Sequence, residues 1–132
     1  MAGLLTHLLV VGIGGLIITY FLKWQYGVAF GFGHLLPDLI DFGITGLFFW
    51  NFKPSIIVIQ DWFYPLKVFG HNPLNWFIIS GLLILTVYGF YKFKKISKVT
   101  MKILILATVF CLIGILIHLL MDVLIQEANH WI

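Results

Sequence analysis

Four long apolar stretches dominate the chain, and short polar connections separate them. A transmembrane α-helix needs roughly 20 consecutive, predominantly apolar residues, and each stretch approaches or exceeds that length. The pattern predicts an all-α integral membrane protein, a bundle of about four transmembrane helices in one domain that covers residues 1–132. The predicted spans are about 2–22, 27–50, 75–91 and 103–125.

The longest connection, 51–74, mixes a short apolar run with aromatic side chains. The run from Ile56 to Ile59 is too short to cross a bilayer. Aromatic rings with a polar edge, such as those of Trp62 and Tyr64, favour the headgroup zone. We therefore expect this segment to be an interfacial loop on the membrane surface.

The second stretch contains a proline inside its apolar pattern. Pro37 has no backbone N–H to donate to the carbonyl of Gly33. Neighbouring helices can satisfy the freed groups in a membrane, so the stretch can still span it. We expect a helix that is kinked or broken near Pro37.

Composition restricts the class of protein further. Hydrophobic residues make up 61% of the chain and charged residues 10%, against about one quarter charged in an ordinary globular chain. This composition excludes a water-soluble domain. The single Cys111 lies in an apolar run and excludes a disulfide framework and a cysteine-based zinc knuckle.

The positive charges indicate how the spans are oriented. The net charge of +3 comes from eight lysines, of which five lie between Lys92 and Lys102. Connections rich in lysine stay on the cytoplasmic side, so we expect the Lys92–Lys102 loop and Lys23 there. Both termini and the loop 51–74 then lie outside, in a cell membrane of prokaryotic type. This clustering is a topology signal and does not indicate nucleic-acid binding.

Ionisable side chains inside the spans call for a functional explanation. An ionised group at the bilayer centre costs about 2.5 to 3.5 kcal/mol on insertion scales. Six of the ten His, Asp and Glu residues nevertheless fall inside predicted spans, and the third span has none. The six are His7, His34, Asp38, Asp41, His118 and Asp122.

The spacing of these residues predicts that they meet. His118 and Asp122 are four residues apart. The His and Asp residues of the second span follow one another at intervals of four and three residues, so they also lie on one helical face. At about 1.5 Å per residue, Asp38 lies near the middle of the membrane and His34 further inward. The residues that converge on the outer half come from four segments: His7, Asp41, His71, His118 and Asp122.

Imidazoles and carboxylates at a shared depth suit a borderline divalent cation, most simply Zn²⁺, with Mn²⁺ or Fe²⁺ as alternatives. Such a cation lowers the pKa of a bound water to around 7, and a spare carboxylate can act as general base. A hydrogen-bonded His/Asp network without metal is the alternative, and for His34 a simple bond to a neighbouring group. The predicted ligands are His7, Asp38, His71, His118 and Asp122, with Asp38 as ligand or general base and with His34 and Asp41 as further candidates.

Four motifs are spread over nearly the whole chain: Thr6-His7, Leu36-Pro37-Asp38 followed by Asp41, His71-Asn72-Pro73, and the segment from His118 to Asp122. Together they resemble those of the YdjM-like, LexA-regulated membrane-bound metal-dependent hydrolase family. The resemblance implies a small multi-span protein whose His and Asp residues bind a divalent metal for hydrolysis, with a likeness to zinc-dependent phospholipases. It implies the same five ligand positions.

The chain departs from the family pattern at two places. The family shows Pro-Asp-x-Asp, whereas the second carboxylate here comes one residue later, at Asp41, which a regular α-helix would turn by about 100°. The family's His-rich stretch before the third span is reduced to His71.

These observations predict a membrane-embedded hydrolase in which a metal-activated water attacks an ester or phosphoester of a lipid-like, membrane-resident substrate. The alternative is a non-enzymatic protein that binds or conducts metal ions, or an accessory subunit of a membrane assembly. The expected partners are the lipid bilayer and a lipid substrate, with no nucleic acid. The sequence is also compatible with a homo-oligomer.

Overall fold

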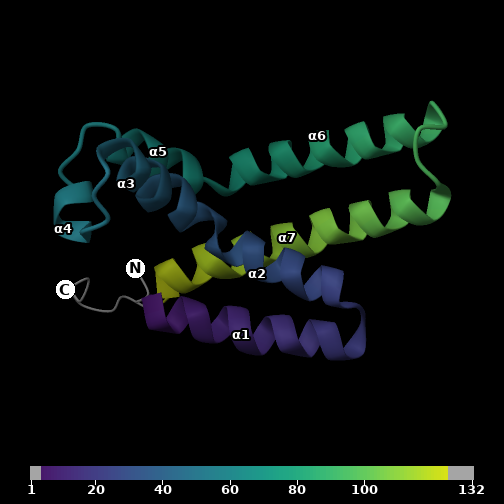
Figure 1. Ribbon diagram of the computed structural model, residues 1–132, viewed down its shortest axis with the longest axis horizontal. Coiled ribbons are helices and arrows are strands. Elements are labelled where there is room, and N and C mark those ends of the chain that lie inside the picture. Colours follow the sequence, from purple (N-terminus) through teal and green to yellow (C-terminus); the bar gives the residue numbers. More distant parts are fainter. Residues whose placement is uncertain (1–3, 125–132) are drawn as a thin grey trace.

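The computed structural model describes residues 4–124, and these form a bundle of helices without a strand (Figure 1). This confirms the predicted all-α membrane bundle. Four elements run along its length: α1 (Leu4–Phe21), α2 (Trp24–Asp38), α6 (Pro73–Lys92) and α7 (Lys98–Leu124).

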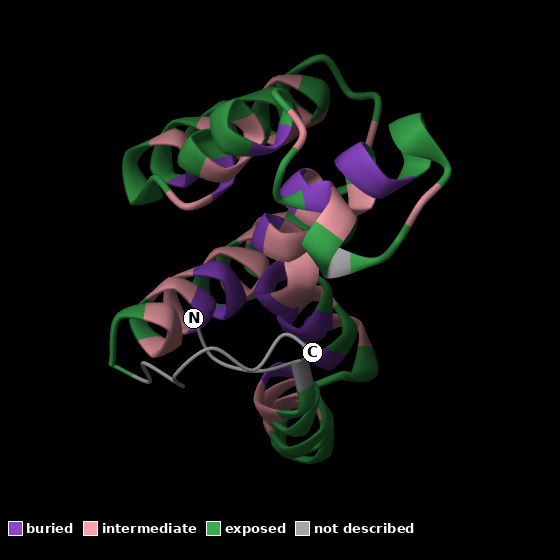
Figure 2. Cartoon of the chain, turned by 90° about the vertical axis from the view of Figure 1, so that its left-hand side faces the viewer, coloured by how far each residue is buried: buried purple, intermediate pink, exposed green. Residues whose placement is uncertain are grey.

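Within the described residues, three helical stretches are long and apolar enough to cross a membrane. They are 24–49, Pro73–Lys92 and Lys98–Leu124. The remaining predicted span corresponds to α1, whose 18 residues rise about 27 Å against a hydrocarbon core of about 30 Å. Large apolar side chains such as those of Leu16 and Leu85 are exposed. Figure 2 shows exposed residues along the outer faces of the helices, as lipid-facing surfaces require.

The second span is helical throughout but irregular after Pro37. α2 is followed by a π-helical segment, η1 (Leu39–Gly43), and then by α3 (Ile44–Phe49). A π-helix carries one extra residue per turn and commonly marks a bend. Figure 1 shows the chain changing direction between α2 and α3. The predicted irregularity near Pro37 is therefore confirmed as a bend with a π-helical segment, without a break in the helix.

Two glycines bring α2 and α7 into backbone contact. A Cβ atom on Gly33 would overlap the carbonyl oxygen of Cys111, and one on Gly114 would overlap that of Phe30. Small residues allow helices to approach this closely in lipid. The contact determines the depth of α2 relative to α7, and with it the relative positions of His34 and His118.

The connection 51–74 contains two short helices, α4 (Pro54–Ile57) and α5 (Phe63–Gly70). α5 packs against η1 and α2, and the Gly70 carbonyl accepts a 2.6 Å hydrogen bond from Trp76 Nε1 of α6. At the start of α6, the Asn72 side chain caps the helix by accepting from the amide of Leu74. This part of the connection therefore holds the residue between α5 and α6, His71, against the bundle.

The polar connections lie at opposite ends of the bundle (Figure 1). One end carries the start of α1, the end of α7 and the helices α3 to α5. The other end carries the turn between α1 and α2, with Lys23, and the lysine-rich turn between α6 and α7. The lysines of the two connections that we expect on the cytoplasmic side therefore lie at the same end of the bundle.

Candidate metal centre

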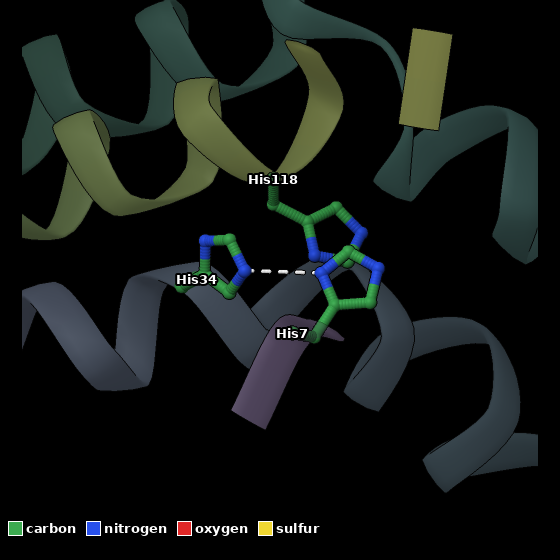
Figure 3. Close-up of side chains that lie close together, drawn as sticks. All are labelled: His7, His34 and His118. Atoms are coloured by element: carbon green, nitrogen blue, oxygen red, sulfur yellow. Dashed lines mark hydrogen bonds between the residues drawn. The ribbon is translucent and has the colours of Figure 1, made fainter. Parts of the chain in front are cut away.

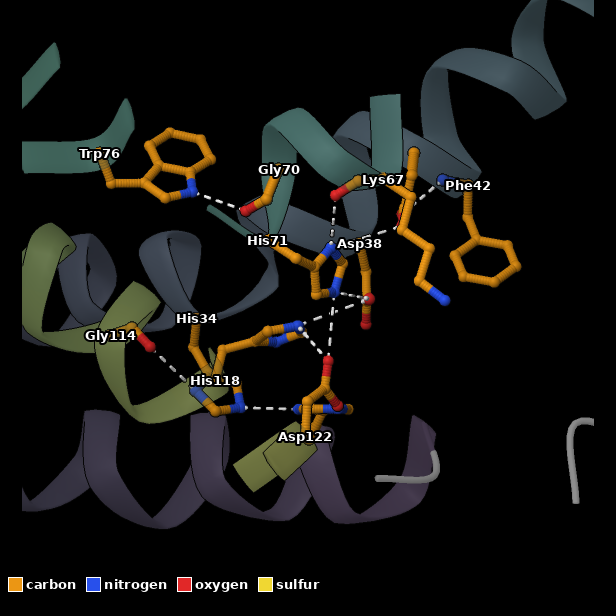
Figure 4. Close-up of polar contacts among 12 residues, drawn as sticks. His34, Asp38, Phe42, Lys67, Gly70, His71, Trp76, Gly114, His118 and Asp122 are labelled. Atoms are coloured by element: carbon orange, nitrogen blue, oxygen red, sulfur yellow. Dashed lines mark hydrogen bonds and ion pairs between the residues drawn. The ribbon is translucent and has the colours of Figure 1, made fainter. Parts of the chain in front are cut away.

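The candidate site lies at the end of the bundle that carries α3 to α5. Four chain segments contribute to it: α1, the α2–η1 span, the residue after α5, and α7. Figure 4 shows their polar side chains pointing toward one another. The contributing residues are His7, His34, Asp38, Asp41, His71, His118 and Asp122.

One nitrogen or oxygen from each of Asp38, His71, His118 and Asp122 lies within 4.8 Å of the others. His71 Nε2 is 3.1 Å from Asp122 Oδ2 and 3.9 Å from Asp38 Oδ1, and His118 Nε2 is 3.5 Å from both carboxylates. Two ligands of a tetrahedral zinc ion, each about 2.0–2.2 Å from the metal, lie about 3.3–3.6 Å apart. The spacing of these four atoms therefore fits a single cation among them.

The tautomer of His71 follows from its backbone contact. Its Nδ1 lies 3.2 Å from the carbonyl oxygen of Lys67, which can only accept, so Nδ1 carries the hydrogen. In the neutral ring, Nε2 then presents a lone pair to the carboxylates of Asp122 and Asp38. Acceptors that face one another need a proton or a cation between them. A histidine that donates its second N–H to a carbonyl is also the usual arrangement for a metal ligand.

The same reasoning extends through two further histidines (Figure 3). His34 Nδ1 donates to the carbonyl of Gly114 at 3.2 Å, which leaves a lone pair on its Nε2. That lone pair accepts from His7 Nδ1 at 3.0 Å, so His7 Nε2 points a lone pair at Asp122 Oδ1, 3.4 Å away. The chain of bonds therefore turns His7 Nε2 toward Asp122, beside the group formed by Asp38, His71, His118 and Asp122.

His118 completes the set. Its side chain is fully buried, and neither ring nitrogen has a hydrogen-bond partner. Its ring stacks on that of His7 with centroids 4.2 Å apart, which brings the Nε2 atoms of both rings to the Asp122 carboxylate. Buried polar atoms without a bond are costly, and ligation of a cation would satisfy His118 Nε2.

His7, His34 and His118 form a second group whose ring nitrogens lie within 4.8 Å of one another. The lone pair of His34 in this group is already used by the N–H of His7. We therefore assign His34 a positioning role: it orients the ring of His7 and determines which of its nitrogens carries the hydrogen.

The π-helical segment η1 determines where Asp41 points. Asp41 is fully buried, its Oδ1 accepts from the amide of Phe42 at 2.7 Å, and its Oδ2 lies 3.7 Å from His71 Nδ1. The offset of about 100° expected of a regular α-helix does not apply, because η1 has a wider turn. Asp41 thus faces the Nδ1 edge of His71, opposite the edge that faces the carboxylates, and lies outside both groups of potential ligands.

The structure thus brings His7, Asp38, His71, His118 and Asp122 together, with His34 and Asp41 at the edge of the cluster. Two backbone carbonyls that select the ring tautomers, those of Lys67 and Gly114, were not expected from the sequence. The spacing of four residues between Lys67 and His71 on a helical segment was the signal available for the first carbonyl. The second belongs to a residue 80 positions from His34 and has no signal in the sequence.

Comparison of the chain with protein-family models, with curated proteins and with solved structures finds no match. The functional argument therefore stands on the geometry of this cluster.

The role of His34 leads to a prediction about metal affinity. A leucine at this position cannot accept from His7, and we expect His34→Leu to weaken metal binding by about 10- to 100-fold, as loss of an outer-sphere partner does. Glutamine presents an N–H and a carbonyl oxygen side by side, so His34→Gln should retain most of the affinity. Competition titration with a chromogenic chelator measures both variants. Equal affinities for the two would show that His34 has no such role.

Proposed function

We propose that the protein is a membrane-embedded, divalent-metal-dependent hydrolase that cleaves an ester or phosphoester of a lipid-like, membrane-resident substrate. One observation carries the proposal. Imidazole nitrogens and carboxylate oxygens from four chain segments face one another at 3.1 to 3.9 Å, a range centred on the roughly 3.3–3.6 Å expected between ligands of one cation. The motif resemblance to the YdjM-like hydrolases implies the same activity.

The ligand chemistry favours zinc. Three imidazoles and a carboxylate, from His7, His71, His118 and Asp122, match the donor atoms that zinc prefers, and Mn²⁺ or Fe²⁺ are the next candidates. A bound cation of this kind supplies Lewis acidity and lowers the pKa of a bound water to about 7.

Asp38 is the residue we assign to proton transfer. Its side chain is 16% exposed, against 9% for Asp122, and it lies on the cluster with its Oδ1 3.5 Å from His118 Nε2. A carboxylate within hydrogen-bond reach of a water at the centre can accept the proton that the water loses on attack. Asp122, which approaches three imidazoles, would hold the cation and the rings in place.

The position of the site favours a substrate that is itself in the membrane. His118 lies six residues before the end of α7, about 9 Å along the helix axis. This depth corresponds to the region just below the headgroups, which a lipid reaches by lateral diffusion. With the Lys92–Lys102 connection cytoplasmic, the site faces the outer leaflet of the cell membrane.

A direct test combines metal analysis with a lipid hydrolysis assay. Protein purified in neutral detergent should contain about one divalent cation per chain and release headgroup or phosphate from at least one lipid class. Chelation should abolish release and readdition of Zn²⁺ should restore it. Asp38→Asn should lower turnover by about 100-fold or more while the metal is largely retained.

Two results would contradict this proposal. The first is a metal-free preparation that binds no added Zn²⁺. The second is a metal-loaded protein without turnover on any lipid class, and uptake of divalent cations by liposomes containing the protein would then favour the ion-conducting alternative.

A further inference from the structure

An open pocket of about 410 Å³ lies directly beside the candidate metal centre. His71 and Asp122 line it, so part of the ligand set faces into the pocket. Lys67 of α5 and apolar side chains of α7, including Leu119 and Val123, form the rest of its walls. A molecule in this pocket would contact the centre without displacing any helix.

Lys67 adds a positive charge to a wall that also contains Asp122. The carboxylates of Asp38 and Asp122 would neutralise a divalent cation held between them, so the centre alone would offer little attraction for an anion. Lys67 is the lysine that lines the pocket, while Lys53 of the same connection is exposed elsewhere. A lysine ammonium is a compact charge that binds phosphate oxygens well. Figure 4 shows Lys67 beside His71 at the edge of the cluster.

A second cavity, an apolar groove of about 390 Å³, lies further along the bundle. α2, α6 and α7 form it, with Trp76 and Ile115 at the end near the centre and Val87 and Leu104 at the far end. Pro73 and Leu119 line the pocket beside the metal centre. Trp76 lies about one helical turn from Pro73, and Ile115 lies about one turn from Leu119. Pocket and groove therefore follow one another along α6 and α7. On α6 the groove covers roughly 16 Å between Trp76 and Val87.

We propose that the pocket and the groove together bind one anionic amphiphile. Its phosphate-type head lies against Lys67 and the metal centre, and its hydrocarbon chain lies in the groove between α6 and α7. The binding itself is inferred from the two cavities and Lys67. That the bound amphiphile is a substrate rests on the proposed function. Lys67 would then determine the preference for an anionic head.

The test uses phosphonates, which cannot be hydrolysed at the carbon–phosphorus bond, and measures binding to the zinc-loaded protein in neutral maltoside micelles. Dodecylphosphonate should bind at least about tenfold more tightly than methylphosphonate, because only the former can fill the groove. Lys67→Gln should weaken binding of both phosphonates by about tenfold at unchanged zinc content, and Lys53→Gln should have no effect.

The variant Ala107→Trp tests the position of the hydrocarbon chain. The new side chain fills the groove and should weaken binding of dodecylphosphonate alone. Its control is Val109→Trp on the lipid-facing side of α7.

Equal effects of Lys67→Gln and Lys53→Gln would overturn the assignment of the head. Equal affinity for the two phosphonates, or equal effects of Ala107→Trp and Val109→Trp, would overturn the assignment of the chain and show that a free phosphate-type anion is the ligand. The expected binding pattern without lipid turnover would count against the hydrolase and support the binding site. Lipid turnover without this binding pattern would support the hydrolase and count against the binding site.

Discussion

Replacement of Asp122 by asparagine is expected to abolish metal binding while the fold survives. The carboxylate approaches three imidazoles, with His71 Nε2 at 3.1 Å, His7 Nε2 at 3.4 Å and His118 Nε2 at 3.5 Å. The side-chain amide of the Asp122→Asn variant is neutral, so it attracts a cation less than the carboxylate does. It can also donate an N–H to one of the imidazole lone pairs, which then needs no cation as a partner. We expect the affinity for Zn²⁺ to fall by about 100-fold or more.

Asp61→Asn is the matched control, because Asp61 is exposed and lies outside both groups of potential ligands. Elemental analysis and chelator competition on the two variants give the comparison. Thermal unfolding adds a second readout: Zn²⁺ should raise the Tm of the Asp61→Asn protein and leave that of Asp122→Asn unchanged. A wild-type Tm that is indifferent to both Zn²⁺ and chelator would favour a hydrogen-bonded network without metal.

Gly114→Ala is expected to have the largest effect on stability. A Cβ atom at this position would overlap the carbonyl oxygen of Phe30 and lie 2.8 Å from the amide nitrogen of His34. Both atoms belong to the backbone of α2, so the helices must separate to accept the methyl group. Overpacking of this kind costs about 1–3 kcal/mol, and we expect the upper end of that range. The separation would also shift the Gly114 carbonyl that holds His34, so metal affinity should fall as well.

Gly81→Ala and Gly89→Ala provide the controls for this effect. Both positions lie in α6, and a Cβ atom at either has nothing within 4 Å. Alanine is favoured over glycine inside a helix by about 0.5–1 kcal/mol, so these two variants should be slightly stabilised. Unfolding in mixed micelles measures all three variants. A Gly114→Ala protein as stable as the two controls would mean that α2 and α7 are not in backbone contact.

The cluster also shows how a lipid-embedded bundle can hold so many polar groups. Two of its buried imidazoles are oriented by a partner on another segment, His34 by the Gly114 carbonyl and His7 by His34. Close packing at Gly33 and Gly114 brings the segments near enough for these bonds. Packing and site chemistry are therefore coupled, and a change in the contact between α2 and α7 should alter metal affinity.

Much of the architecture was predictable from local features of the sequence. Hydropathy over about 20 residues predicts a membrane helix, because lipid requires apolar side chains along the whole span. The helical repeat predicts that His118 and Asp122 share a face, and Pro37 predicts the irregularity of the second span, because each depends on neighbouring residues alone. The His and Asp side chains inside apolar segments indicated a site, since their burial is costly without a partner.

Only the tertiary structure decided how the site is assembled. The bond from His34 to Gly114 joins residues 80 positions apart, and it determines which nitrogen of His7 faces Asp122. The π-helical segment that carries Asp41 packs against α5, the helix that ends just before His71. The pocket at Lys67 is lined by residues of α5, α6 and α7, which are far apart in the sequence. Hydropathy and helical repeat act within one segment, whereas the position of a hydrogen or a ligand atom depends on contacts between segments that the chain brings together only on folding.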